Sequence, residues 1–541
     1  MKDALSQLRN ASPLMVNILT TGVDPFTDNI RLIQLAGPSR PVVTINPGNA
    51  TTQTTELVSE VLKSPGTKVF HNAKLQLKFL RRAGLQVNGA LFDTLLAHQL
   101  LTAGMASRGE ALADLATDYL GERIAGNQLK NSALDIPVIK RLAKGLISDL
   151  KEAGLMGTAH LEFECIPPVA EMELNGMLLD LDKWQALSSK LQQEKARLEL
   201  TLHQELGEIN LASPQQLLQA LRAKGLAIER TDRATLGPLR KQYRSVKDLE
   251  LYRRVSKLVQ AFAHAIPKHI HPSTGRIHPE YRQIGTATGR FSCRNPNLQQ
   301  IPRDKAFRGC FIPSPGYKMM IADYSQIELR VAAEMSNDTR MIQAYRKRQD
   351  LHRLTAALVM DKPLDQVTKK ERQAAKAVNF GLMYAMGSQS LMAYAQNTYG
   401  VEMSLQEAET FRGKFFAAYQ RLAHWHSQTA RSLQRETRTL AGRRRTWQDK
   451  PPLTELLNSP VQGSAADILK KALAMLPKEL EGTESRINSM VHDEINLEAP
   501  VDKAQKAAQI LKETMERAGR YYLKKVPVEI DVSIADSWAE K

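Results

Sequence analysis

The sequence predicts an N-terminal α/β domain followed by a larger α+β domain. The chain has 541 residues, more than a single hydrophobic core usually organises, so we expect at least two domains. Over residues 1 to about 125, short apolar strands alternate with helical patterns, which is typical of α/β folds. From about residue 165 onwards, long charged helical patterns and a glycine-punctuated, strand-like stretch replace this alternation.

In the N-terminal part, strands are predicted in "RLIQLAG", "PVVTINP" and "TKVFHNA", and helices in "LQLKFLRRAGL" and "FDTLLAHQLLTAG". Residues 126–160 predict a helical connection. The stretch from 165 to 270 is helical and charged, 272–335 is strand-like, and 336–450 is helical and rich in Arg and Lys. The remainder predicts a helix in "SAADILKKALAMLPKEL", a strand in "SMVHDEINLEAP", a further helix, and a last strand in "PVEIDVSIA".

Composition narrows the class of protein. Hydrophobic residues make up 43% of the chain and charged residues 24%, which favours a globular protein over a disordered one. No apolar run approaches the roughly 20 residues of a membrane helix, and the N-terminus lacks the apolar core of a secretory signal. Cys165, Cys293 and Cys310 share no metal-ligand spacing, which favours a reducing compartment. We therefore expect a cytoplasmic protein, in a bacterium or in a host cell if the source is viral.

The formal net charge of +17 favours a polyanionic partner, and nucleic acid is the usual one. From charge alone, a merely basic soluble protein is an equally good interpretation.

Two predicted strands carry acidic residues among apolar ones. The strand from 489 to 500 is interrupted by His492, Asp493 and Glu494, and "YKMMIADYSQIELR" carries Asp323. Buried carboxylates are costly unless compensated, and two that converge repel unless a divalent cation lies between them. Hard oxygen ligands suit Mg²⁺. The alternative is that each Asp ends its strand as a turn residue or pairs with a basic neighbour.

The stretch "KKERQAAKAVNFGLMYAMGS" places Arg372, Lys376, Phe380 and Tyr384 four residues apart, along one stripe of a helix. Two cations followed by two aromatics suit a nucleoside triphosphate, with the cations on phosphates and the aromatics on sugar and base. An amphipathic helix with snorkelling cations and core aromatics would show the same spacing.

These stretches resemble family A DNA polymerases, the group that contains the large fragment of bacterial DNA polymerase I. "DYSQIELR" is similar to the family's motif A, "RQAAKAVNFGLMY" to motif B and "VHDE" to motif C. "TATGRFSCRNPNLQQIP", "QDLHRLTA", "LAGRRRTW" and "NSPVQGSAADILKKAL" also match in order and type. The resemblance implies an exonuclease-like (ribonuclease H-like) α/β domain over 1–160 and a right-hand α+β polymerase domain over 161–541. The implied parts are a thumb at about 185–270, a palm at about 271–335 and 459–541, and fingers at about 336–458.

The resemblance also implies the chemistry and its residues. Asp323 and Asp493 would bind two Mg²⁺ ions, for which Mn²⁺ can substitute, with the Tyr324 carbonyl near the metal and Glu494 assisting. Lys376 would donate a proton to the departing pyrophosphate. The residues implied to contact the incoming nucleotide are Arg372, His352, Gln326, Glu328, Phe380 and Tyr384, with Glu328 as the gate against a 2′-hydroxyl. Those implied to contact DNA are Arg290, Asn297, Gln462 and His492. The expected partners are primer-template DNA and dNTPs, with no membrane and a monomeric chain, in replication and repair.

The N-terminal part departs from the family. The exonuclease pattern Asp-x-Glu-Thr-Thr-Gly reads "NILTTG", so Asn17 and Leu19 replace both acidic residues, and Gln76 replaces a third. Asp135 matches the last Asp, with Asn131 where a Tyr is expected. Leu19 cannot coordinate Mg²⁺ and neutral amides bind it poorly, which predicts loss of proofreading.

Two other classes of protein share some of these features. A nuclease is disfavoured by these missing carboxylates. A silent nucleic-acid-binding protein is disfavoured by the intact Asp323, Asp493, Arg372 and Lys376. A further departure from the family is Ala385, where Gly usually follows the motif B Tyr.

Overall fold

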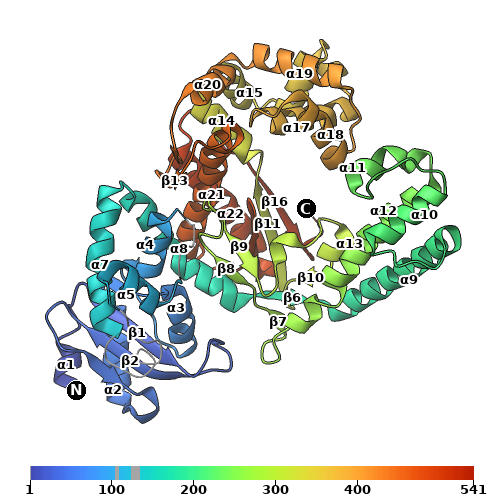
Figure 1. Ribbon diagram of the computed structural model, residues 1–541. Coiled ribbons are helices and arrows are strands. Elements are labelled where there is room, and N and C mark those ends of the chain that lie inside the picture. The colour runs from blue at the N-terminus through green and yellow to red at the C-terminus, as the bar shows by residue number, and fades with distance from the viewer. Residues whose placement is uncertain (1, 104–108, 123–134, 541) are drawn as a thin grey trace. The chain divides into compact units, whose positions relative to one another are not determined.

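The computed structural model describes residues 2–103, 109–122 and 135–540 (Figure 1). The chain divides into two units, both discontinuous in sequence. The first contains Met1–Asn175, Glu280–Arg294 and Met320–Ile534. The second contains Gly176–Pro279, Asn295–Met319 and Ala535–Lys541. In the described residues, no helix is both long enough and apolar enough to cross a bilayer.

The first unit begins with a five-stranded mixed sheet in the order β3-β2-β1-β4-β5. Its strands are β1 (Leu14–Thr20), β2 (Ile30–Ala36), β3 (Val43–Ile45), β4 (Lys68–Phe70) and β5 (Leu91–Asp93). β1 pairs antiparallel with β2 and parallel with β4, and β4 pairs parallel with β5. The α/β fold predicted for the N-terminal part is confirmed.

Helices pack on this sheet, and together they enclose one apolar core. They are α1 (Lys2–Ser6), η1 (Pro47–Asn49), α2 (Thr52–Lys63), α3 (Ala73–Arg82), α4 (Thr94–Leu101), α5 (Leu112–Leu120) and α7 (Asp135–Glu152). The start of α4 is fixed by Asp93, whose carboxylate accepts from the backbone N–H groups of Leu95 and Leu96. The predicted helical connection corresponds to α7 and the start of α8 (Met156–Asn175), while residues 126–134, Asn131 among them, lie outside the described residues.

Helix α8 links the N-terminal sheet domain to the rest of the first unit. It packs against α3 and α4, and also against α21 (Leu453–Glu479) and β14 (Arg486–Val491). The predicted domain boundary at residue 160 falls inside this continuous helix.

A second sheet in the first unit has the order β14-β15-β11-β16. Its other strands are β15 (Glu494–Pro500), β11 (Tyr317–Tyr324) and β16 (Ile530–Ala535). The prediction of one strand over residues 489–500 is wrong, because β14 and β15 form an antiparallel hairpin that turns at His492 and Asp493. Both strands are almost wholly buried, so they lack the polar alternation that would have marked two strands. The turn lies at the polar pair, where His492 adopts a φ of 60°.

Helix α22 (Ala504–Tyr522) packs on β15 of this second sheet, and α21 packs against α22 and lies beside it in Figure 1. Helix α14 (Ile327–Ser336) packs on α21, and η7 (Val501–Lys503) packs against α22. Two short hairpins complete this part: β8 (Glu280–Arg282) with β9 (Ser292–Arg294), and β12 (Glu436–Arg438) with β13 (Arg444–Thr446). The β12–β13 hairpin is a departure from the helical prediction for 336–450.

The remaining helices of the first unit form successive packed pairs, from α16 with α17 to α19 with α20. They are α15 (Thr339–Arg346), α16 (Leu351–Val359), η6 (Leu364–Gln366), α17 (Lys369–Leu382), α18 (Ser388–Tyr399), α19 (Leu405–Ala418) and α20 (Gln420–Arg431).

The second unit is mainly helical. Its helices are α9 (Leu181–Leu206), α10 (Pro214–Ala223), α11 (Arg233–Leu236), η2 (Gly237–Lys241), α12 (Arg244–Leu258), η3 (Val259–Ala263), η4 (Ile266–His269), η5 (Leu298–Gln300) and α13 (Lys305–Arg308). A small sheet has the order β10-β6-β7, with β6 (Met177–Leu179), β7 (Arg276–Ile277) and β10 (Phe311–Ile312). Its aromatic core places Phe311 edge-on to both Trp184 and Trp538.

Candidate functional site

Two carboxylates lie at one end of the second sheet. Asp323 is the penultimate residue of β11, and Asp493 lies in the turn between β14 and β15. The backbone N–H of Tyr324 donates to the Asp493 carbonyl over 3.2 Å, so the two acidic residues belong to adjoining backbone segments. Both are partly exposed, whereas Glu494 is buried and accepts from the Asn496 amide at 3.0 Å.

This end of the sheet fits a divalent cation that is completed by substrate oxygens. Within the described ranges, no group of three or more His, Cys, Asp or Glu side chains could hold a metal ion. Mg²⁺ commonly binds through only one or two carboxylates together with substrate phosphates. Asp323 and Asp493 supply that number of carboxylates on two adjoining segments. Asp493 is a turn residue, as the alternative interpretation expected. Its turn adjoins the end of the strand that carries Asp323, because the Asp493 carbonyl accepts from the Tyr324 N–H.

Helix α17 carries the predicted stripe of cations and aromatics. A capping box fixes its start, where Thr368 and Glu371 exchange hydrogen bonds. Arg372, Lys376 and Phe380 are partly exposed, while the intervening Ala and Val residues are buried. The stripe is therefore the open face of a helix that packs by its other side.

Partners hold several members of this stripe. The Nε of Arg372 donates to Asp350 at 2.6 Å, and Lys376 Nζ lies 5.9 Å from the centre of the Tyr399 ring. Tyr384 is not part of the helix, which ends at Leu382 before Ala385 takes a φ of 59°. That left-handed residue reverses the chain and presents Tyr384 from a turn.

His352 is buried and held in one tautomer. The Asn379 amide nitrogen donates to its Nδ1 at 2.8 Å, and the Asn379 oxygen accepts from Thr355 at 2.9 Å. An accepting Nδ1 leaves the proton of a neutral imidazole on Nε2, where it can be donated to a ligand. Burial lowers the pKa of His352 to about 4, so the ring is neutral near pH 7.

Glu328, Tyr384 and Arg290 form a connected group. Glu328 lies in the first turn of α14, where its carboxylate accepts from the Tyr384 hydroxyl at 2.5 Å and pairs with Arg290. Burial, together with the neighbouring Glu328, raises the pKa of Tyr384 well above its usual range. The hydroxyl therefore stays a donor. Gln326, which precedes α14 with a φ of 55°, accepts from the Tyr345 hydroxyl at 3.3 Å.

The residues expected to contact DNA lie on different elements. Gln462, on α21, accepts from the Thr288 hydroxyl at 2.8 Å. His492 is exposed in the β14–β15 turn. Asn297 belongs to the second unit, where its side chain caps η5 by accepting from the Gln299 N–H at 3.1 Å.

The residues predicted to be degenerate exonuclease positions come together in the N-terminal domain. Asn17 Nδ2 donates to Asp135 at 2.8 Å and to Gln34 at 3.1 Å. Gln76 accepts from the Ile18 backbone N–H at 2.9 Å, and its amide nitrogen donates to Asn17 Oδ1 and to the His71 carbonyl. These contacts close a network of amides around one carboxylate.

A metal ion does not fit this network. Asn17 and Gln76 direct N–H₂ groups at the neighbouring oxygens, where a cation would need lone pairs. Leu19 follows on the same strand with no oxygen ligand. Burial raises the pKa of Asp135 to about 6, and the hydrogen bond from Asn17 offsets only part of this effect.

Sequence reasoning missed several residues that position these side chains. Asn379 and Asp350 hold His352 and Arg372, and Thr288 contacts Gln462. A signal existed for Asn379, because a polar residue at a buried position of an apolar helix face needs a partner. Four buried charges, Glu162, Arg443, Asp467 and Lys470, were also missed.

Comparison with known proteins gives the class. A model described as "DNA polymerase family A" matches residues 181–540, and one described as "3'-5' exonuclease" matches residues 1–141. The DNA polymerase I of Aquifex aeolicus is 32% identical over 580 residues, covering 100% of this chain and 98% of that protein. The thermostable DNA polymerase I of Thermus aquaticus is 36% identical over 396 residues, which cover 68% of this chain and 46% of that protein.

A solved structure, titled "POL domain of Pol1 from M. smegmatis complex with DNA primer-template and dNTP", matches with a TM-score of 0.89 and 27% identity. It covers 99% of this chain, and this chain covers 98% of it. An exonuclease-like mixed-sheet domain joined to a polymerase domain defines a template-directed nucleotidyltransferase. The chain belongs to DNA polymerase family A and is a DNA-directed DNA polymerase, resembling the large fragment of DNA polymerase I. Enzymes of this family use a divalent metal.

Proposed function

We propose that this polymerase adds deoxynucleotides to a primer 3′-hydroxyl at a site built on Asp323 and Asp493, and that it lacks 3′–5′ proofreading. The proposed domains are an exonuclease-like domain over 1–160 and a polymerase domain over 161–541. The thumb would occupy about 185–270, the palm about 271–335 and 459–541, and the fingers about 336–458.

The palm carboxylates would hold two Mg²⁺ ions, or Mn²⁺ in their place, with the Tyr324 carbonyl near them and Glu494 assisting from its buried position. When bound, the metal ions supply charge stabilisation for the attacking and departing oxygens of the phosphoryl transfer. The fit rests on the backbone hydrogen bond that joins Tyr324 to Asp493.

The open stripe of α17 would bind the triphosphate. Arg372 and His352 are suited to the outer phosphates, because Asp350 holds the Arg372 guanidinium and His352 carries its proton on Nε2. Lys376 would donate a proton to pyrophosphate, and Phe380 would pack on the sugar. The ring centres of Phe380 and His352 lie 5.8 Å apart, which supports a shared site.

Glu328, held by Tyr384 and Arg290, would exclude a 2′-hydroxyl, with Gln326 nearby. Arg290, Gln462, His492 and Asn297 would contact the primer-template. The solved relative's title names primer-template DNA and dNTP, and we propose the same partners for a monomeric chain that works in the cytoplasm during replication or repair.

The absence of proofreading rests on one observation. Asn17 and Gln76 direct their amide groups into the former metal site and bond to Asp135 and to each other. Reactivating this site would require breaking that network and would still leave Leu19 without an oxygen ligand.

A labelled primer-template incubated with Mg²⁺, with and without dNTPs, tests both parts on a denaturing gel. We expect extension with dNTPs and an unchanged primer without them. Shortening that disappears with chelation would overturn the loss of proofreading. Absence of extension, with DNA still bound, would overturn the proposed palm site.

A further inference from the structure

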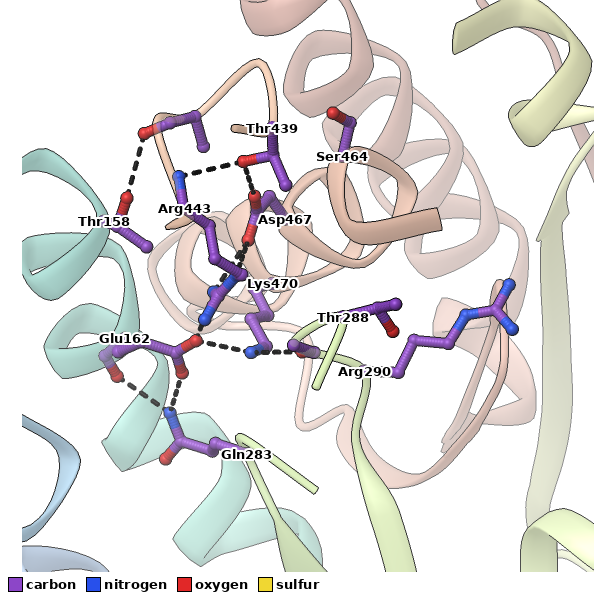
Figure 2. Close-up of polar contacts among 12 residues, drawn as sticks. Thr158, Glu162, Gln283, Thr288, Arg290, Thr439, Arg443, Ser464, Asp467 and Lys470 are labelled. Atoms are coloured by element: carbon purple, nitrogen blue, oxygen red, sulfur yellow. Dashed lines mark hydrogen bonds and ion pairs between the residues drawn. The ribbon is translucent and has the colours of Figure 1, made fainter. Parts of the chain in front are cut away.

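Four charged side chains form a buried cluster where three parts of the chain meet (Figure 2). Glu162 comes from α8, Arg443 precedes β13, and Asp467 and Lys470 lie on α21. Their side chains are between 0% and 5% exposed. Arg443 donates to Asp467 at 2.9 and 2.7 Å and also pairs with Glu162, which pairs in turn with Lys470.

The cluster is balanced in charge and well supplied with hydrogen bonds. Two carboxylates face two cations, and the Gln283 amide donates to the Glu162 carboxylate at 2.9 Å. Thr439 donates to the second oxygen of Asp467 at 2.6 Å. Burial alone would raise the pKa of Glu162, but the adjacent Lys470 and Arg443 outweigh it and lower the pKa. Such a cluster adds little net stability over apolar packing, so its presence here points to a role in geometry.

One hydrogen bond connects the cluster to the backbone at Gly289. Lys470 Nζ donates to the Gly289 carbonyl at 2.8 Å. Gly289 has a φ of +83°, and a Cβ built there would lie 2.4 Å from Nε of Arg443. On helix α21, a Cβ at Gly463 would lie 2.8 Å from the carbonyl oxygen of Thr288, the residue before Gly289. Two glycines therefore let the segment at 288–289 pass directly against the buried charges.

The residues that flank Gly289 both reach the proposed catalytic region. Thr288 donates to Gln462, and Arg290 pairs with Glu328, which in turn accepts from Tyr384. A single peptide thus separates the carbonyl held by Lys470 from the arginine that holds Glu328.

We propose that the buried cluster is a positioning device: Lys470 and its partner Glu162 fix the peptide at Gly289, and thereby place Arg290 against Glu328 for selection of the nucleotide sugar. This inference rests on the proposed role of Glu328. Lys470 itself touches no substrate. Its effect passes through the backbone to Arg290, so its loss should change selectivity more than it changes the rate with dNTPs.

The test is Lys470→Met in the full chain, with Lys471→Met as the matched control. Lys471 is the next residue on α21, pairs with Glu164 at 3.0 Å and is 22% exposed, whereas the side chain of Lys470 is fully buried. The measurement is kcat/KM for dATP and for ATP opposite template thymine. We expect Lys470→Met to lower the preference for dATP by about tenfold, since small displacements at a reacting centre cost such factors. Lys471→Met should leave it unchanged.

A single substitution leaves the cluster one positive charge short and can prevent folding. The double variant Glu162→Gln with Lys470→Met keeps the charge balanced while still releasing the Gly289 carbonyl. We expect it to recover thermal stability and to keep the relaxed selectivity. Selectivity equal to wild type in a folded variant of either kind overturns the inference.

Glu328→Ala measured in parallel separates this inference from the proposed function. If Glu328→Ala leaves the preference for dATP unchanged, the role of Glu328 as a gate is wrong. If Glu328→Ala relaxes the preference and neither cluster variant does, only the positioning role of Lys470 is wrong.

Discussion

The hydroxyl of Tyr384, in the turn after α17, donates a 2.5 Å hydrogen bond to Glu328 in the first turn of α14. This bond ties the turn after α17, the helix proposed to bind the triphosphate, to the helix that follows strand β11. A substrate sugar bound between these elements would meet a carboxylate fixed in place, with no freedom to retreat from a 2′-hydroxyl.

Glu328→Ala should therefore raise ribonucleotide incorporation. We expect the preference for dNTP over rNTP to fall by at least about tenfold, a change of ~1.4 kcal/mol. Tyr384→Phe, which removes only the hydrogen bond, should give a smaller effect. Glu402→Ala, at an exposed carboxylate, serves as the control. Single-nucleotide insertion kinetics measure the ratio, and an unaltered ratio in Glu328→Ala would contradict the gate.

Asp493→Asn should abolish incorporation and spare DNA binding. Loss of one metal-binding carboxylate removes charge stabilisation of several kcal/mol, so the rate should fall by roughly a thousandfold or more. Asp502→Asn, at an exposed aspartate of η7, should retain full activity. Rapid-quench extension and primer-template binding by fluorescence anisotropy measure the two properties. Loss of both together would point to misfolding or to a role in binding DNA.

Asn17→Asp should destabilise the N-terminal domain at neutral pH. The new carboxylate would replace a donor with a like charge 2.8 Å from the Asp135 oxygen position, which we expect to cost ~2–4 kcal/mol. The cost should shrink near pH 5, where the two carboxylates can share a proton. Asn29→Asp, at an exposed position before β2, is the control. Thermal melts at both pH values give the comparison, and a variant as stable as wild type at pH 7.5 would refute the closed network.

Acid should unfold the protein through its buried histidines. Burial lowers the pKa of His71, His352 and His426 to about 4. Since these values lie below the unfolded value of about 6.5, the stability they contribute is complete above pH 6.5 and is lost as the pH falls toward 4. Asp135, with its pKa raised to about 6, has the opposite sign and offsets part of the loss.

Thermal melts between pH 7.5 and 4.5 follow this titration. His426→Gln, which keeps a donor for the Met383 carbonyl, should flatten the slope by up to one proton. An identical slope in wild type and variant would show that other groups control acid unfolding.

Asn379→Leu should weaken nucleotide binding through His352. Without the Asn379 donor, the imidazole is free to place its proton on Nδ1, away from the ligand, and the Thr355 hydroxyl loses its acceptor. We expect KM for dNTP to rise about tenfold with a smaller change in kcat, and a stability loss of ~1–3 kcal/mol. Asn397→Leu, at an exposed asparagine of α18, is the control. A lower kcat at constant KM would contradict this role.

Local pattern was enough to predict much of the fold. The strand that carries Asp323, the helix that carries Arg372 and Lys376, and the α/β character of the N-terminal domain are all confirmed. The hairpin around Asp493 was missed because strands buried on both faces lack alternation, and because a two-residue turn of His and Asp has no glycine to mark it.

Contacts between distant segments could not be predicted. Glu162 and Lys470 are 308 residues apart, and each alone looks like an ordinary charge on a helix. The departure of the N-terminal domain from the exonuclease pattern was visible in the sequence, but the bonding of Asn17 to Asp135 depends on α7 meeting β1. The same holds for Tyr384, whose place depends on one left-handed residue, Ala385.

The uninterrupted course of α8 constrains how this enzyme can change over evolutionary time. Helix α8 packs on the exonuclease-like domain and also supplies Glu162 to the buried cluster next to the proposed polymerase site. If proofreading is lost as proposed, the metal ligands of the former nuclease could have been replaced one codon at a time, at positions such as Asn17 and Leu19. Deleting the whole domain would be more harmful, because the polymerase domain would then keep α8 without the helices α3 and α4 that pack against it. A domain that has lost its proposed activity would therefore be retained for the structural support that it gives to the polymerase domain.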